Sequence, residues 1–179
     1  MRIERVWAMP NKNTFDIKPI KRLIDRYNNG GISVDPFANT NRIAKLCNDI
    51  DPECGTEYCM DALDFLETLD RGTADLLLFD PPYSVRQVSE SYRRVGRTVN
   101  METTQSSFWS NLKKEIQKVV KPGGIVISCG WNSGGIGKTL GFKIEEILLV
   151  PHGGPHNDTI CTVEKNVRKS LLDFGIDLH

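Results

Sequence analysis

The chain has 179 residues, of which 39% are hydrophobic and 26% are charged, with 15 glycines and 9 prolines. These proportions are typical of an ordered globular protein and exclude a chain that is disordered throughout. Its 23 basic and 23 acidic residues cancel, which excludes the overall attraction to nucleic acid of a strongly basic protein.

The sequence also carries no signal for export or membrane insertion. No apolar run approaches the roughly 20 residues of a membrane span, and the N-terminus carries Arg2, Glu4 and Arg5 with no apolar core of a signal peptide. Its 5 cysteines are odd in number and form no C-x-x-C pair, which is typical of reduced thiols. We therefore expect a cytoplasmic protein with a single domain over 1–179, no membrane contact and no bound metal.

The first predicted elements alternate between helix and strand. Apolar residues at i, i+3, i+4 and i+7 predict a helix over 20–27, followed by a short strand over 32–37 and a brief helix over 42–47. Helical spacing recurs over 62–69. The consecutive apolar residues within 74–79 predict a strand that is covered on both faces of a parallel sheet.

The alternation resumes after a polar stretch. Residues 84–106 show no periodicity, so we expect a long loop, which in a compact domain is usually functional. A helix over 107–120 and a strand over 125–129 follow, then a glycine-rich turn that leads into a helix. The last two strands are predicted over 142–150 and 159–163. This alternation predicts an α/β fold with a mostly parallel sheet.

Polar residues stand out at three places along the chain, within 35–40, 48–52 and 79–83. Ligands of open parallel sheets bind beyond the carboxyl ends of the strands, so these segments are the candidate site. Residues 48–80 carry 10 acidic side chains and a single basic one, Arg71, so part of this candidate site is expected to be negatively charged.

The segment Asp80-Pro81-Pro82-Tyr83 is the most specific of the three. Its prolines fix two φ angles and remove two N–H donors, so the Asp80 carboxylate and the Pro81 carbonyl form a rigid pair of acceptors. Such a pair suits the exocyclic amino group of a base, and Tyr83 offers a ring on which that base would stack. The same residues would also suit a proline-stiffened turn with Tyr83 over the core.

This segment resembles the active-site element of the amino-methylating DNA methyltransferases that use S-adenosylmethionine. The similarity is greater to the small stand-alone adenine methylases of phages and mobile elements, and it extends from Trp7 to about Val163. The resemblance implies a Rossmann-like class I methyltransferase fold with helices flanking the sheet and an antiparallel C-terminal strand. It also implies adenine N6 in DNA as the substrate. The catalytic residues that it implies are Asp80, Pro81, Pro82 and Tyr83.

The resemblance further implies a site for S-adenosylmethionine. Residues 35–39 correspond to the family's Asp-Pro-Phe-x-Gly motif, 13–20 to the segment that closes over the cofactor, and 61–63 to the element beneath its adenine. Asp49 or Asp51 would hold the ribose hydroxyls. The implied cofactor-binding residues are Thr14, Phe15, Ile17, Asp35, Pro36, Phe37, Ala38, Asn39, Asp49, Asp51, Asp61 and Ala62.

Two features of this site keep alternatives open. Asn39 stands where the family has glycine; asparagine tolerates a left-handed turn, but its side chain fills space that glycine leaves open, which puts cofactor affinity in question. Asp49 and Asp51 lie 14 and 16 residues beyond Asp35, somewhat short of the roughly 20 typical of dinucleotide folds. Either acid would also serve as a loop residue or a helix N-cap.

Five residues of the predicted loop are candidate contacts to nucleic acid: Arg86, Tyr92, Arg93, Arg94 and Arg97. A target base in a duplex must leave the stack, and cations beside the catalytic segment would hold the distorted strand by its phosphates. The same arginines would equally suit a solvated loop. Because 84–106 is the sole candidate for target recognition, sequence specificity would require a homodimer, another partner or lax recognition.

Other functions compete with DNA methylation. Residues 132–139 imitate a phosphate-binding P-loop, but Asn132 stands where the pattern needs glycine and the acidic strand comes first. Two cysteines, Cys54 and Cys59, and two histidines, His152 and His156, have only loose zinc-site spacing. RNA base methylation, or a catalytically silent binding protein of the same fold, would use the same residues.

Overall fold

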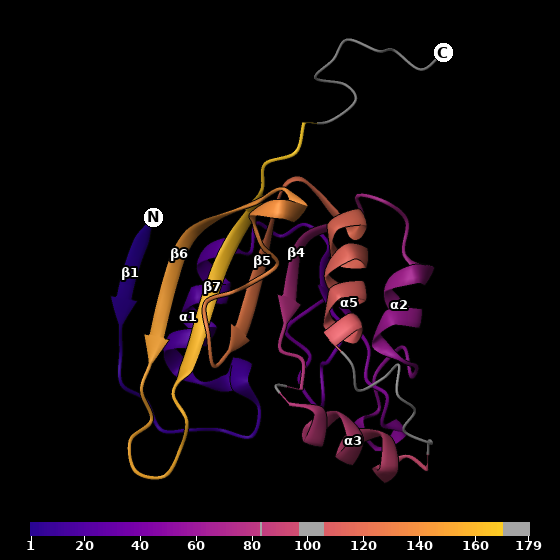
Figure 1. Ribbon diagram of the computed structural model, residues 1–179, viewed down its shortest axis with the longest axis horizontal. Helices are drawn as coiled ribbons and strands as arrows, with labels where there is room; N and C mark the ends of the chain where they lie inside the picture. Colours follow the sequence, from indigo (N-terminus) through magenta and orange to yellow (C-terminus); the bar gives the residue numbers. More distant parts are fainter. Residues whose placement is uncertain (83, 97–105, 170–179) are drawn as a thin grey trace.

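A computed structural model describes residues 1–82, 84–96 and 106–169 (Figure 1). The strands of this part of the chain are β1 (Arg2–Arg5), β2 (Ser33–Asp35), β3 (Leu46–Cys47), β4 (Ala74–Phe79), β5 (Val120–Gly130), β6 (Phe142–Val150) and β7 (Thr159–Asn166). The helices are α1 (Lys18–Tyr27), α2 (Ala62–Thr68), α3 (Val85–Arg94) and α5 (Ser106–Val119). Short 3-10 helices cover Thr14–Asp16, Pro52–Cys54 and Lys138–Leu140.

The described strands form one sheet in the order β1-β6-β7-β5-β4-β2-β3. β7 is antiparallel to both of its neighbours, β5 and β6. The pairs β1–β6, β2–β3, β2–β4 and β4–β5 are parallel. The predicted mostly parallel sheet with an antiparallel C-terminal strand is therefore confirmed.

Strand β4 is covered on both faces of the sheet, which explains its four consecutive apolar residues, Leu76-Leu77-Leu78-Phe79. Leu77 and Phe79 pack into the hydrophobic cluster formed with α2 and α5, whereas Leu76 and Leu78 pack into the cluster formed with α1. Successive side chains of a strand point to opposite faces, and helices cover both faces here (Figure 1). The strand predicted over 74–79 is confirmed with the same bounds.

The helices that flank the sheet follow the predicted apolar stripes. Ile20, Leu23 and Ile24 of α1 are fully buried. Pro19 lies in the first turn of the helix, where a backbone N–H has no partner within the helix, so its missing N–H costs no hydrogen bond. In α5, Leu112 and Ile116 lie one turn apart and are fully buried. Both helices were predicted within two residues of their ends.

The strand order creates a crevice at one edge of the sheet. From β2 the chain continues to β3, which lies on one side of β2 in the sheet. From β4 it continues to β5, which lies on the opposite side. The direction in which the chain adds strands therefore reverses between the neighbours β2 and β4. The carboxyl ends of these strands point the same way, and α3 lies beyond the end of β4 (Figure 1). Ligands of open α/β sheets bind at such a reversal.

Helix α3 contradicts the expectation of a loop over 84–106, since residues 85–94 are helical. The helix starts at Ser84, whose Oγ accepts a hydrogen bond from the Gln87 amide at 3.2 Å. It buries Val88 and Tyr92, which lie one turn apart. So narrow an apolar stripe in a polar sequence produces little periodicity, which is why sequence reasoning missed the helix.

The brief helix predicted over 42–47 is also wrong. The Asn41 side chain accepts a hydrogen bond from the Ile43 amide at 2.7 Å, and Ser33 Oγ accepts one from the Lys45 amide at 3.0 Å. These side chains satisfy amides that a helix would have used, and the chain then enters β3. β1, which the sequence analysis did not predict, is a mainly polar strand that pairs only with β6.

The glycine-rich turn after β5 leads into the 3-10 helix Lys138–Leu140 instead of the predicted α-helix. The amides of Ile136 and Gly137 donate to the carboxylate of Glu164, at 2.5 and 3.0 Å. Glu164 belongs to β7 and is 1% exposed. Because this carboxylate uses the donors that a phosphate would need, the geometry agrees with the rejection of a P-loop.

In the ranges that the structure describes, no helix combines the length and the apolarity needed to cross a bilayer.

Candidate functional site

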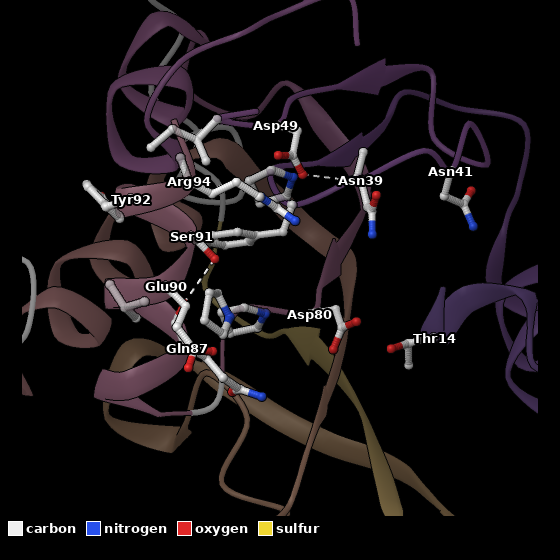
Figure 2. A pocket seen from close by; sticks show the side chains of 18 of the residues that line it. Thr14, Asn39, Asn41, Asp49, Asp80, Gln87, Glu90, Ser91, Tyr92 and Arg94 are labelled. Atoms are coloured by element: carbon white, nitrogen blue, oxygen red, sulfur yellow. Dashed lines mark hydrogen bonds between the residues drawn. The ribbon is translucent and has the colours of Figure 1, made fainter. Parts of the chain in front are cut away.

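A pocket of about 480 Å³ opens at the carboxyl ends of β2, β3 and β4 (Figure 2). This volume falls within the range of about 300 to 1,000 Å³ that is usual for small-molecule sites. The predicted site residues that line it are Thr14, Phe15, Pro36, Phe37, Ala38, Asn39, Asp49, Asp61, Ala62, Asp80, Pro81 and Pro82. The fold thus joins the candidate catalytic segment and most candidate cofactor residues in one cavity.

The turn after β2 is held by Asn39 and Asp49. Asn39 has a φ of 49°, the one positive value at a non-glycine position among the described residues. Its amide donates to Asp49 Oδ2 at 2.8 Å, and its Oδ1 accepts from the Thr40 amide at 2.8 Å (Figure 2). The expectation that asparagine preserves this left-handed turn is confirmed.

Asp35 lies behind the pocket and not in its lining. Its carboxylate accepts a hydrogen bond from the Phe37 amide at 3.0 Å, and its side chain is 1% exposed. Burial raises the pKa of Asp35 to about 8, and the nearby carboxylates of Asp80 and Asp49 add to that shift, although the Phe37 amide opposes it. Asp35 therefore shapes the turn that carries the lining residues.

Asn48, which sequence reasoning did not single out, connects two segments of the pocket. Its Nδ2 donates to the carbonyls of Pro36 at 3.1 Å and Met60 at 3.0 Å, and its Oδ1 accepts from the Met60 amide at 3.1 Å. The side chain is completely buried. It fixes the turn after β2 against the residues that lead into α2.

The structure separates Asp49 from Asp51. Asp49 lines the pocket, whereas Asp51 is 6% exposed and lies outside the lining. Asp51 Oδ1 accepts from the Glu53 amide at 3.0 Å as the N-cap of a 3-10 helix, and its Oδ2 lies 3.0 Å from Arg94 Nε. Of the two candidates for a contact to ribose, only Asp49 faces the cavity.

Asp80 ends β4 and points into the pocket from the side opposite α3 (Figure 2). Pro81 is buried, and the carbonyl of Pro82 accepts a hydrogen bond from Trp109 Nε1 at 3.3 Å. This bond fixes the end of the segment against α5. Tyr83 lies outside the described residues.

The N-terminal segment forms another wall. Thr14 and Phe15 line the pocket, and the neighbouring Asn13 donates to Thr40 Oγ1 at 3.3 Å, which joins this segment to the turn after β2. Ile17 is 5% exposed and packs in the hydrophobic cluster with α1, outside the lining. It supports the wall and does not face the cavity.

Helix α3 forms the remaining wall, and of its lining residues the sequence analysis had singled out only Tyr92 and Arg94. Its lining residues are Gln87, Val88, Glu90, Ser91, Tyr92 and Arg94. The Ser84 N-cap and the spacing of Gln87, Ser91 and Arg94 at helical intervals were the signals available. The other missed lining residues are Lys12, Asn13, Asn41, Ile50 and Phe108.

Two of the candidate nucleic-acid contacts, Tyr92 and Arg94, bind other side chains of the protein. Tyr92 is 8% exposed, and its hydroxyl donates to Asp61 Oδ2, so its ring is not presented to a large ligand. Arg94 pairs with Asp51. Arg86 Nε pairs with Glu90 at 2.8 Å, and Arg93 is exposed. Arg97 lies outside the described residues.

The charge of the lining favours a ligand with net positive charge. Four carboxylates face two cations around the cavity: Asp49, Asp61, Asp80 and Glu90 against Lys12 and Arg94. Over the described part of the chain, no group of three or more His, Cys, Asp or Glu side chains could hold a metal ion.

No protein-family model and no curated protein match this sequence. Solved structures do match. TrmN from Thermus thermophilus is 15% identical over 84% of this chain and 49% of its own, with a TM-score of 0.53. The 1,6-didemethyltoxoflavin-N1-methyltransferase of Burkholderia thailandensis, solved with S-adenosylhomocysteine, is 10% identical over 83% of this chain and 76% of its own, with a TM-score of 0.55.

The N-methyltransferase NodS from Bradyrhizobium japonicum WM9, solved with S-adenosylhomocysteine, is 12% identical over 88% of this chain and 90% of its own, with a TM-score of 0.51. The chain spans about half the length of TrmN. At these identities the likeness establishes the fold. The chain has the Rossmann-like fold of class I methyltransferases, as the sequence predicted.

Proposed function

We propose that this protein is an S-adenosylmethionine-dependent methyltransferase that acts on the exocyclic amine of a nucleic-acid base, with adenine N6 in DNA as the substrate. The observation that supports it most is the position of Asp80. Its carboxylate enters, from the end of β4, the same cavity that Asn39, Asp49 and Asp61 line from the neighbouring segments. A methyl acceptor bound at Asp80 would therefore lie beside a ligand bound at the other three residues.

The residues present fit the cofactor. S-adenosylmethionine carries a sulfonium and an ammonium group against one carboxylate, so its net charge suits the acidic lining. Asp49 faces the cavity with a carboxylate suited to vicinal ribose hydroxyls, and Asp61 with one suited to an amino group. When bound, S-adenosylmethionine supplies an electrophilic methyl group on a sulfonium centre.

The chain's own contribution is to hold the acceptor amine. The Asp80 carboxylate and the Pro81 carbonyl accept the two N–H bonds of the amine, which directs its lone pair into the cavity and increases the electron density on nitrogen. Because the Trp109–Pro82 hydrogen bond fixes this segment, the acceptors need little reorganisation when the amine arrives. The nitrogen loses one proton as it gains the methyl group, and the adjacent Asp80 carboxylate can accept that proton.

Transfer of a labelled methyl group tests this proposal. Purified protein is incubated with labelled S-adenosylmethionine and duplex DNA, single-stranded DNA or RNA, and the product nucleosides are identified. We expect N6-methyl-2′-deoxyadenosine from DNA, and a loss of at least about 100-fold in Asp80→Ala because the acceptor pair is incomplete.

Asp75→Ala is the matched control. Asp75 lies near the opposite end of β4, where its carboxylate binds the Ile32 amide and Lys121 Nζ, both at 2.8 Å. This variant should keep its activity. Methylation that persists in Asp80→Ala would contradict the proposed mechanism. Methylation of RNA alone would reassign the substrate, and cofactor binding without transfer would identify a silent binding protein.

A further inference from the structure

Asp61 stands at the edge of an apolar part of the pocket. Ile50, Ala62, Val88 and Phe108 line the cavity and belong to the same hydrophobic cluster, or pack against it. Apolar walls with one carboxylate at their edge suit a flat heterocycle that carries an amino group, because an ionised carboxylate can only accept hydrogen bonds. The other lining carboxylates, Asp49, Asp80 and Glu90, come from different segments.

Both oxygens of Asp61 are held by protein donors. Oδ1 accepts from the Leu63 amide at 2.9 Å, as the N-cap of α2, and Oδ2 accepts from the Tyr92 hydroxyl. Each carboxylate oxygen has a second lone pair, so these bonds orient the group and still leave it able to accept from a ligand.

Tyr92 itself has a fixed position. It is 8% exposed, and it packs in the cluster that contains Ala62, Val88 and Phe108. Two residues further along α3, Arg94 pairs with Asp51 at 3.0 Å, which anchors the end of the helix to the loop after β3. The Tyr92 hydroxyl therefore contacts Asp61 from a helix whose end is fixed by the Arg94–Asp51 ion pair.

We infer that Tyr92 is a positioning residue, which fixes the Asp61 carboxylate as the acceptor for the adenine amino group of the cofactor and so makes the site selective for an adenosyl group. This inference rests on the proposed function, since it concerns how the same cavity holds the cofactor. A carboxylate in this orientation attracts the 6-amino group of adenine and repels the 6-carbonyl of hypoxanthine.

Binding of two ligands that differ only at this position tests the inference. S-adenosylhomocysteine and S-inosylhomocysteine are titrated calorimetrically into the wild-type protein, Tyr92→Phe and Asp61→Asn. Wild type should prefer the adenosyl compound, and Tyr92→Phe should lose about tenfold of that preference, the size expected for a hydrogen bond to a charged group. In the Asp61→Asn background, Tyr92→Phe should have no further effect on the ratio.

Tyr58→Phe is the matched control, because Tyr58 packs on Phe65 of α2 beside the same cluster and lies outside the described lining. It should keep the wild-type ratio. An unchanged ratio in Tyr92→Phe, with adenosyl binding intact, would overturn this inference alone. If wild type bound neither compound, the proposed function would fail, and this inference with it.

Discussion

Two walls of the pocket differ in how they are held. The first, which we call the sheet wall, consists of the lining residues within 36–50 that follow β2 and β3. The second, the α3 wall, consists of the lining residues within 87–94. Asn48 and Asp35, both almost fully buried, hold the sheet wall through hydrogen bonds to its backbone.

The α3 wall depends on side chains that reach it from other segments. Its polar anchors include the Tyr92–Asp61 hydrogen bond and the Arg94–Asp51 ion pair, and the Arg94 side chain is 65% exposed. Buried hydrogen bonds to backbone are costly to lose, whereas ion pairs with an exposed partner contribute little. The comparison indicates that the sheet wall is part of the folded core and that the α3 wall is attached to it more weakly.

Among the substitutions that remove a contact in either wall, removal of the Asn48 side chain should cause the largest loss of stability. Asn48→Ala leaves the Pro36 carbonyl and both backbone groups of Met60 without their partner, and we expect the free energy of unfolding to fall by about 4 kcal/mol. Urea denaturation followed by circular dichroism measures this. The control Asn29→Ala removes one exposed bond, to the Gly31 amide, and should cost well under about 1 kcal/mol. Equal effects would refute the buried role of Asn48.

The pH dependence of the free energy of unfolding tests whether Asp35, which holds the same wall, is protonated in the folded protein. Its pKa is about 8 in the folded protein against 3.8 as the ordinary value, so between these pH values the folded state keeps a proton that the unfolded state releases. Stability should therefore fall as pH rises from about 4 to about 8, by up to about 1.4 kcal/mol for each pH unit, and level off above.

Asp35→Asn replaces the protonated carboxyl by a neutral group of similar shape and should flatten this profile. The free energies of unfolding of both proteins, measured between pH 5 and pH 9, give the two slopes. Parallel profiles would show that Asp35 is ionised in the folded protein over this pH range, which would mean that burial does not raise its pKa.

The smallest effect is expected in the α3 wall. Arg94→Gln breaks the ion pair with Asp51, and since the arginine is mostly exposed we expect a loss of less than about 1 kcal/mol. Hydrogen exchange of the α3 amides should nevertheless become faster, because the end of the helix loses an anchor. Arg93→Gln, at the exposed neighbouring position, should leave the exchange unchanged. A loss as large as that of Asn48→Ala would remove the distinction between the walls.

The sequence predicted those parts of the site whose signals are local, although it missed Asn41 and Ile50 of the sheet wall and wrongly predicted a helix over 42–47. The apolar strand over 74–79 and the polar residues after each strand follow from burial on both faces of a parallel sheet, and both are seen. Asp49 and Asp51 were not separable, since their distances from Asp35 differ by only two residues. Their orientations depend on the 3-10 helix that Asp51 caps and on Arg94.

The α3 wall was not predictable for the opposite reason. Its partners, Asp51 and Asp61, lie more than thirty positions earlier in the chain, and no local spacing indicates those contacts. The basic residues of 84–100 were interpreted as a nucleic-acid surface because their charge was visible and their partners were not. Tertiary contacts thus decided both the secondary structure and the orientation of this segment.

The place of β7 in the sheet has a consequence for biosynthesis. β7 lies between β5 and β6 and is the last described strand along the chain, so β1 and β6 join the rest of the sheet only through it. During translation, both halves of the sheet leave the ribosome with an unpaired edge until residues 159–166 emerge. The nascent chain therefore has to avoid aggregation through these exposed strand edges until β7 emerges.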